Sequence, residues 1–449
     1  MNAIKQSYVL HRSLGQPPRK ISHGKGVFLY DSDGREYLDA CGGAAVSCLG
    51  HGDRDVADAI KQQLDAVAYV HSGFFTSDVT ESLAEKLINL VGGNARAALF
   101  FGSGSEAMEA AFKMVRQYHL ERGEPSRTHI ISRTHSYHGA TLGALGVGGL
   151  DGRKRHFKPW LMHRTCSHIS PCYPYRFALQ GESEEAYAIR LGNEFEAEIL
   201  RVGAKNVAVF VAETIVGATL GTVPPVKGYF KRIREICDRY GIVLVLDEVM
   251  CGMGRSGQWL ACHQEQIDPD IVCVAKGLGG GFQPIGAMII NKQIYRALET
   301  GSGAFLHGQT YMGHAAACAG SLAVVKKIIR HRLLENVRER GRQLKSVLEN
   351  YFRNHPHIGD IRGRGLFCSI ELVKDKATKK SFSPDFNIHQ KIKAEAMNNG
   401  LLCYPGGGNL DGGTGDHVLL SPPFIIQSHQ INDIVDRLGS SIKTVLQSL

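Results

Sequence analysis

Short apolar runs alternate with helical patterns through the middle of this 449-residue chain, and this alternation constrains the fold more than any other feature. Helical patterns at residues 195–202 and 230–240 lie between runs whose length and apolar content are typical of buried strands. Strands that alternate with helices form βαβ units and assemble into a mostly parallel sheet. The sequence therefore predicts an α/β fold with helices flanking the sheet. The predicted strands are residues 98–101, 129–132, 207–212, 242–246 and 271–275.

The pattern changes at both ends of the chain. Near the start, GVFLYDSDGREYLDA contains two extended runs joined by an Asp-Gly turn, which predicts a hairpin. The C-terminal part combines helices at 335–353 and 430–447 with short strands around 365–372 and a Gly-rich loop at 405–415. We expect the two ends to pack together as a separate small unit. The expected division is a large domain, residues 56–320, and a smaller α+β domain, residues 1–55 and 321–449.

Composition excludes several classes of protein. A hydrophobic content of 43% and a charged content of 21% are ordinary for a globular protein. The net charge is +9, but the basic residues are dispersed among acidic ones, which does not favour a nucleic-acid partner. No apolar run approaches the roughly 18 to 20 residues of a membrane span, and MNAIKQSYVLHRSL has no apolar signal region. We therefore expect a cytoplasmic protein that does not bind a membrane.

The cysteines give no reason to expect a disulfide framework or a metal. There are 11 of them, an odd number scattered through apolar segments, which is typical of reduced thiols. His163, Cys166, His168 and Cys172 are ligand types that suit zinc, but their spacing matches no common site and their neighbours predict a loop. No metal site is expected.

Lys276 directly follows the apolar run at 271–275 and precedes GLGGG. Open α/β sheets bind ligands at the carboxyl ends of their parallel strands, where this lysine is expected to lie. An amine partly removed from water there loses its proton more readily and becomes a nucleophile toward a carbonyl. A lysine that reaches solvent from a strand end explains this stretch equally well. The residues at the other strand ends are needed to choose between the two interpretations.

Two neighbouring strand ends carry acids, because Glu213 follows VAVFVA, and Asp247 and Glu248 follow IVLVL. At the same edge the GSGS loop at 102–105 leads into a helix, whose first N–H groups and dipole favour a phosphate. Each feature alone has an ordinary explanation as a helix cap, a surface acid or a turn. Together they suit pyridoxal 5′-phosphate (PLP), whose aldehyde forms an imine with Lys276 while a carboxylate keeps the pyridine nitrogen protonated.

Motifs along nearly the whole chain resemble the class III aminotransferases, also called ω-transaminases, which are PLP enzymes of fold type I. The matching stretches stand in the order of the family: GSGSEAMEAAFKMVR, SYHGAT, AETIVGA, VLDEVMCGMGRSG, AKGLGGGFQPIGA, HGQTYMGH, IRGRGLF and GDHVLLSPPFII. The resemblance implies the same large and small domains that the alternation predicts. It therefore supports the expected fold independently.

The resemblance also implies roles for individual residues. Lys276 is the Schiff-base lysine, Asp247 the partner of the pyridine nitrogen, and Glu213 an acid beside the ring oxygen and the substrate. Tyr137 and Val249 are expected to lie on opposite faces of the ring. The residues implied to bind the cofactor are Ser103, Gly104, Ser105, Tyr137, His138, Asp247, Val249, Lys276 and Thr310.

The implied reaction moves an amino group from a primary amine or an ω-amino acid to pyruvate or 2-oxoglutarate by a ping-pong mechanism. Thr310 matches a threonine that reaches the phosphate across a dimer interface, so we expect a homodimer with shared active sites, or a tetramer built from it. A decarboxylase, an aminomutase or a phospholyase on the same scaffold is the alternative. A nucleotide-binding module is disfavoured because GSGSEA lacks the third glycine of the dinucleotide fingerprint.

Three positions depart from the commonest text of the family. Gly102 stands where many members have Asn, and Thr214 replaces the Pro that usually follows Glu213. Thr414 stands at or next to the position where many relatives have an arginine, which binds the carboxylate of the oxo acid in those proteins. Arg362 and Arg364 are candidates to replace it by their position in the sequence, and a purely structural role is the alternative for Arg364.

The substrate pocket is expected to include Cys48, Phe74, Phe75 and Thr414. An apolar pocket without that arginine favours amines or long ω-amino substrates over short α-amino acids. Core packing is an equally good explanation of the two phenylalanines.

Overall fold

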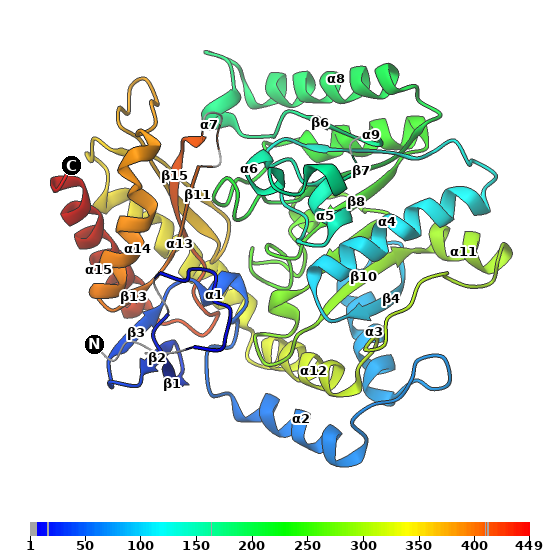
Figure 1. Ribbon diagram of the computed structural model, residues 1–449, viewed down its shortest axis with the longest axis horizontal. Helices are drawn as coiled ribbons and strands as arrows, with labels where there is room; N and C mark the ends of the chain where they lie inside the picture. Colours follow the sequence, from blue (N-terminus) through cyan, green and yellow to red (C-terminus); the bar gives the residue numbers. More distant parts are fainter. Residues whose placement is uncertain (1–6, 16–17, 163, 409, 411–412) are drawn as a thin grey trace.

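The computed structural model of the protein describes residues 7–15, 18–162, 164–408, 410 and 413–449. Three sheets organise this part of the chain (Figure 1). In the largest, β10 runs antiparallel to both neighbours, and the other pairs are parallel. This mostly parallel mixed sheet confirms the predicted fold class. Its strands lie in the order β4 (Ala95–Phe101), β10 (Gly286–Asn291), β9 (Ile271–Val274), β8 (Val243–Asp247), β7 (Val207–Glu213), β5 (His129–Arg133) and β6 (Cys166–Ile169).

Alternate residues of the central strands face opposite layers of helices. In β7, Phe210 packs in the same core as α8 (Glu184–Val202) and α9 (Tyr229–Tyr240). Val211 packs in another core, which contains α4 (Gly104–Glu121). Because both faces of the sheet are covered, these strands are apolar throughout rather than alternating.

Local signals predicted one helix boundary correctly and missed another. The helix α9 ends at Gly241, whose φ of 64° is the left-handed conformation that glycine favours. The helix α8 begins well before the predicted residue 195, because Ser183 caps its first turn by accepting a hydrogen bond from the N–H of Ala186.

The two ends of the chain form two four-stranded sheets at the left of Figure 1. The predicted hairpin is confirmed by the antiparallel pairing of β2 and β3, and β13 from the C-terminal part pairs with β3. Gly365 lies between β11 and β12 rather than in a strand. The first sheet contains β1 (Ile21–Lys25), β2 (Phe28–Asp31), β3 (Glu36–Asp39) and β13 (Leu401–Leu402), and the second contains β11 (Ile358–Gly363), β12 (Cys368–Leu372), β15 (Asp416–Leu420) and β14 (Tyr404–Gly407).

The helix α12 (Ala315–Arg330) connects the large sheet to the sheets of the chain ends. Its Cys318 packs in the core of the large sheet, whereas Val324 packs in a core shared with Leu38 and Ile434. On this basis we propose the division into residues 56–320 and residues 1–55 with 321–449.

The remaining helices surround these layers, and none in the described part of the chain is long and apolar enough to cross a membrane. All 11 cysteines are described and unbridged. These helices are α1 (Gly42–Ala45), α2 (Arg54–Ala66), α3 (Asp78–Val91), α5 (Leu142–Val147), α6 (Asp151–Lys154), α7 (Pro174–Phe177), α10 (Cys262–Glu265), α11 (Lys292–Thr300), α13 (Leu333–Tyr351), α14 (Ile388–Asn398), α15 (Ser428–Gln447) and the 3-10 turns η1 (Lys158–Trp160), η2 (Lys276–Leu278) and η3 (Pro384–Phe386).

Candidate active site

A cavity of about 610 Å³ lies at the carboxyl ends of β7, β8 and β9 and at the start of α4. The N-terminal part of the chain closes another side of it through Gly43, Ala44 and Val46. This is where ligands bind in open α/β sheets. The predicted site residues that line it are Ser103, Gly104, Ser105, Tyr137, His138, Glu213, Asp247, Val249 and Lys276.

Lys276 is placed in the cavity by a sharp change of backbone direction at the end of β9. Its φ of 48° lies in the left-handed region, which costs a residue with a side chain roughly 1 to 2 kcal/mol. The chain then turns through η2, where the N–H of Gly279 donates to the carbonyl of Lys276. Burial lowers the pKa of the Lys276 amine, although the charges of Asp247 and Glu213 act in the opposite direction. A larger share of this amine is therefore neutral, and so nucleophilic, than of a lysine in water.

Asp247 is held in a fixed orientation at the end of β8. One carboxylate oxygen accepts a hydrogen bond from the N–H of Val249 at 3.0 Å. The other lies 2.9 Å from Nδ1 of the buried His138, whose N–H donates to it. The Nε2 atom of His138 has no partner among the described residues. The structure thus places His138 against Asp247, where it orients the carboxylate toward the cavity.

Glu213 lies beside Asp247, because the two residues pair across β7 and β8. Burial and the charge of Asp247 raise the pKa of Glu213 to about 8, although the Arg133 guanidinium acts in the opposite direction. Its Oε2 atom has no hydrogen-bond partner within the described chain. The buried Arg133 donates instead to the backbone carbonyl of Glu213. Arg133 was not predicted from the sequence, although its charge at the end of the apolar run at 129–132 was the available signal.

Because the pKa of Glu213 is raised, the cofactor-free protein should lose stability as pH rises. The unfolded carboxyl ionises near 4.5 and the folded one near 8, so between these values the unfolded state binds fewer protons. The free energy of unfolding should fall by up to about 1.4 kcal/mol per pH unit from this group.

Thermal unfolding of the Glu213→Gln variant between pH 5 and 9 measures this contribution. The variant should gain stability over the parent at pH 8 and show little difference at pH 5. The exposed Glu299→Gln change is the matched control. Parallel pH profiles for the parent and Glu213→Gln would contradict the assignment.

The start of α4 has the form of a phosphate cradle. Ser103 caps the helix, and its hydroxyl accepts from the N–H of Glu106 at 3.2 Å. At Gly104 a side chain would bring its Cβ within 2.7 Å of Val249, and at Gly286 within 2.4 Å of the carbonyl oxygen of Ser103. The glycines thus allow backbone and neighbouring side chains to meet closely at this helix end. Free N–H groups and the helix dipole here favour a phosphate.

The residues that line the cavity fit PLP on several grounds in this structure. The cavity combines one buried amine, an oriented carboxylate and a helix start with a glycine that tolerates no side chain. The unpartnered Oε2 of Glu213 is a buried polar atom that a bound group would satisfy. Lys276 would hold the aldehyde carbon, Asp247 the pyridine nitrogen, and residues 103–105 the phosphate.

Glu248, which also follows the apolar run of β8, is structural. It is fully buried, and its carboxylate accepts from the N–H groups of Ala261 at 2.6 Å and Cys262 at 2.7 Å. The hydroxyl of Thr214 donates to it at 2.9 Å. The departure from the family at Thr214 therefore supplies a partner to a buried acid.

The two arginines considered as replacements at position 414 do not line the cavity. Arg362 donates to the carbonyl of Gly221 at 2.7 Å and forms ion pairs with Asp360 and Glu371. Arg364 pairs with Glu265. Both stabilise contacts between segments, so neither takes the place of the missing arginine at this cavity, and the structural alternative for Arg364 is the one that its pair with Glu265 supports.

Five further predicted residues lie outside the lining of this cavity in the described chain. Phe74 and Phe75 are 79% and 69% exposed. Thr310 is also exposed, and its carbonyl accepts from the hydroxyl of Tyr69. The buried Cys48 contacts the residue after Lys276, with its thiol 3.4 Å from the carbonyl of Gly277. Thr414 lies in the Gly-rich segment, where its carbonyl accepts from the N–H of Leu410.

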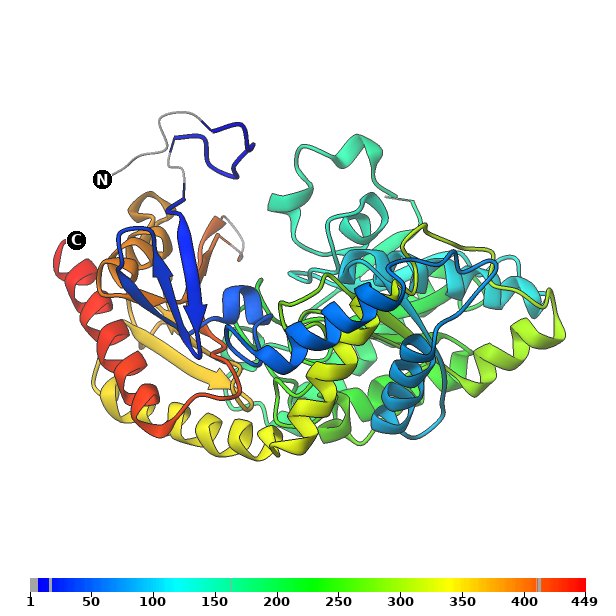
Figure 2. The same ribbon diagram turned by 90° about the horizontal axis from the view of Figure 1, so that it is seen from below.

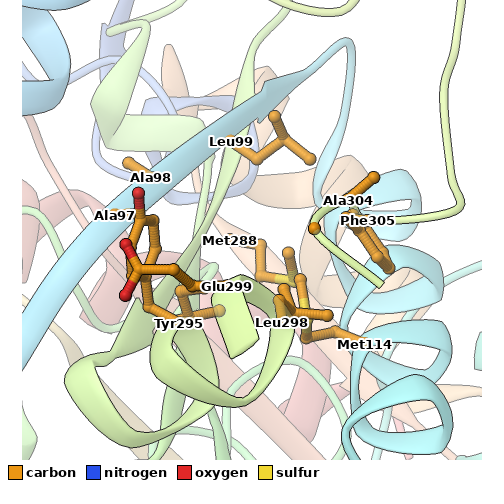
Figure 3. A pocket seen from close by; sticks show the side chains of 12 residues that line it. Ala97, Ala98, Leu99, Met114, Met288, Tyr295, Leu298, Glu299, Ala304 and Phe305 are labelled. Atoms are coloured by element: carbon orange, nitrogen blue, oxygen red, sulfur yellow. The ribbon is translucent and has the colours of Figure 1, made fainter. Parts of the chain in front are cut away.

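A second cavity, of about 330 Å³, lies between β4, β10, α4 and α11 and has a different character (Figure 3). Its walls are mostly apolar, and Glu299 is its one carboxylate. No amine faces this carboxylate among the residues that line the cavity. Among described residues no group of metal-binding side chains is present either, and His163 of the cluster considered for zinc lies outside them. The chemistry therefore converges at the cavity that contains Lys276.

Comparisons with known proteins find matches along nearly the whole chain. The model of the family described as "Aminotransferase class-III" matches residues 9–442. The chain is 44% identical over 445 residues to "Uncharacterized aminotransferase C1771.03c" of Schizosaccharomyces pombe, covering 99% of this chain and 97% of that protein.

Two further proteins bear on substrate and cofactor. A "Diaminobutyrate--2-oxoglutarate transaminase" of Halomonas elongata is 33% identical over 441 residues, covering 96% of this chain and 92% of that protein. The ω-transaminase of Pseudomonas jessenii, solved in complex with PMP, superposes with a TM-score of 0.90 at 33% identity, covering 96% of this chain and 93% of that one.

Proposed function

The chain belongs to the class III aminotransferases, which are PLP-dependent enzymes, and we propose that it transfers an amino group from a primary amine or ω-amino acid to pyruvate or 2-oxoglutarate. The two half-reactions would share one site in a ping-pong cycle. The observation that carries the proposal is the convergence of Lys276, Asp247 and the start of α4 on one cavity. The name of the Halomonas elongata relative, a diaminobutyrate transaminase, supports an ω-amino donor.

PLP, when bound, supplies an aldehyde that links to amines and a ring that accepts negative charge from the substrate carbon. Lys276 would act twice, first as the attachment point and then, once displaced, as the base that removes a proton from that carbon. Its lowered pKa favours the neutral form that this role needs. Asp247, held by His138 and the N–H of Val249, would retain the proton on the ring nitrogen.

Glu213 would act in its protonated form at neutral pH. A neutral carboxyl is a hydrogen-bond donor as well as an acceptor, so it can pair with an oxygen of the cofactor or substrate. A second negative charge beside Asp247 is avoided at the same time. Tyr137 and Val249, both in the lining, are the proposed contacts on the two faces of the ring.

We also propose a homodimer in which Thr310 reaches the site of the partner. The support is an exposed aromatic surface at residues 69–75 and 310–311. The ring centres of Tyr69 and Tyr311 lie 5.7 Å apart there. Tyr311 is 66% exposed, as are Phe74 and Phe75 to a similar extent. Aromatic residues are enriched at the centres of interfaces. The cytoplasmic location stays a prediction.

An assay with a panel of donors tests the proposed function. Purified enzyme is supplied with PLP, with either pyruvate or 2-oxoglutarate, and with 4-aminobutyrate, diaminobutyrate, benzylamine or a short α-amino acid. We expect alanine or glutamate to form fastest with the amines and ω-amino acids. Equal or faster transfer from α-amino acids contradicts the donor preference, and release of CO₂ without consumption of an oxo acid supports a decarboxylase.

A further inference from the structure

Two arginines that sequence analysis did not consider line the active-site cavity. Arg12 lies in the N-terminal segment, and Arg153 lies in α6. Within the described residues, neither guanidinium makes an ion pair or a hydrogen bond. The buried Arg133 and Arg362, by contrast, are occupied by carbonyl or carboxylate partners. Two unpaired guanidiniums at a substrate cavity are candidate groups for an anionic ligand.

Arg153 is placed close to the reacting amine. Its guanidinium carbon lies 4.6 Å from the centre of the Tyr137 ring, a cation–π contact that restricts its position. Its charge is among those that lower the pKa of Lys276. A carboxylate adjacent to the carbon that reacts at Lys276 would therefore lie within the field of Arg153.

Arg12 lines the cavity from a different part of the chain, on an N-terminal segment with little packing. Tyr8, Leu10 and Leu14 around it are 93%, 86% and 77% exposed. Figure 2 shows this dark-blue segment above the molecule, facing the teal region that contains α6. Arg12 nonetheless lines the same cavity as Arg153 and Lys276. It is thus positioned to contact the end of a substrate that points away from the reacting carbon.

We propose that Arg153 binds the carboxylate next to the reacting carbon of the 2-oxo acid, and that Arg12 binds a second, distal carboxylate. The acceptor is then a dicarboxylic 2-oxo acid, such as 2-oxoglutarate, in preference to pyruvate. This assignment rests on the proposed aminotransferase function. It explains how a chain with threonine at position 414 binds carboxylates, because guanidinium groups from two other segments take over the role.

Steady-state kinetics with three acceptors separates the two roles. The acceptors are 2-oxoglutarate, pyruvate and an aldehyde without a carboxylate. Arg12→Ala should raise KM about tenfold for 2-oxoglutarate and leave pyruvate unchanged. Arg153→Ala should raise KM about tenfold for both oxo acids and leave the aldehyde unchanged. The exposed Arg155→Ala and Lys20→Ala changes, outside the cavity, are the matched controls.

A binding measurement keeps the inference independent of turnover. Calorimetry of the PLP-loaded enzyme with glutarate should show weaker binding in both arginine variants, whereas glutaramide should bind the parent and variants alike. Unchanged glutarate binding, or a KM that rises equally for the aldehyde, overturns the assignment. A parent enzyme that transfers no amino group to any acceptor refutes the proposed function instead, and the glutarate result still decides the roles of Arg12 and Arg153.

Discussion

The Lys276→Ala enzyme should be inactive, with kcat lowered by about 10⁴-fold or more. Lys276 is the one lysine among the described residues that line the cavity, so no neighbour can replace it as attachment point and base. Its backbone conformation at φ 48° is unfavourable for alanine as well, so the substitution adds no new strain. Initial rates with excess PLP, beside a circular dichroism spectrum, measure the effect and check the fold.

Two controls make this result specific to the amine. Lys276→Arg keeps a positive charge but removes the nucleophile, and it should be as inactive as Lys276→Ala. The exposed Lys292→Ala change on α11 should leave kcat unchanged. Activity within tenfold of the parent in Lys276→Ala would show that another group performs the chemistry.

The second large effect is expected at Asp247. In Asp247→Asn the amide can still accept from the N–H of Val249, but it carries no negative charge to hold a proton on the ring nitrogen. We expect kcat to fall about 10³-fold while the fold is preserved, because charge stabilisation of this kind typically contributes that much. The rate of the first half-reaction, followed by cofactor absorption in a stopped-flow instrument, measures it.

The neighbouring Glu248 provides the matched comparison. Glu248→Gln weakens the hydrogen bonds to Ala261 and Cys262, so it should lower thermal stability and leave kcat nearly unchanged in the enzyme that remains folded. A kcat that falls equally in both variants would show that the effect of Asp247 is structural. A small effect of Asp247→Asn would contradict its role at the ring nitrogen.

The parts of the fold that depend on local pattern were predictable. All five predicted apolar runs became strands, and the four that are β5, β7, β8 and β9 pair in parallel between two layers of helices. The fifth, β4, is a partly exposed edge strand that pairs antiparallel with β10. The strand β6 was interpreted as a loop because it is short and its Ser167 and His168 are polar, as an edge position allows. The antiparallel β10 was not predicted, since it follows a Gly-rich turn with no helix before it.

The residues of the site also divide into those that a local pattern predicts and those that it does not. Lys276, Glu213 and Asp247 were found because each ends an apolar run, and strand ends of a parallel sheet meet at one edge. The contact of His138 with Asp247, and the approach of Arg12 and Arg153 to the cavity, join residues far apart in the sequence. No local pattern encodes such contacts, because they depend on how separate segments pack.

The central claim is that Lys276 carries PLP. The most direct test is to reduce the purified, PLP-loaded enzyme with borohydride and to locate the modified residue by peptide mass spectrometry. We expect loss of the visible absorption band and a single peptide, containing Lys276, that has gained the mass of a reduced pyridoxyl phosphate group. A protein that takes up no PLP, or a modification located on another lysine, would contradict it.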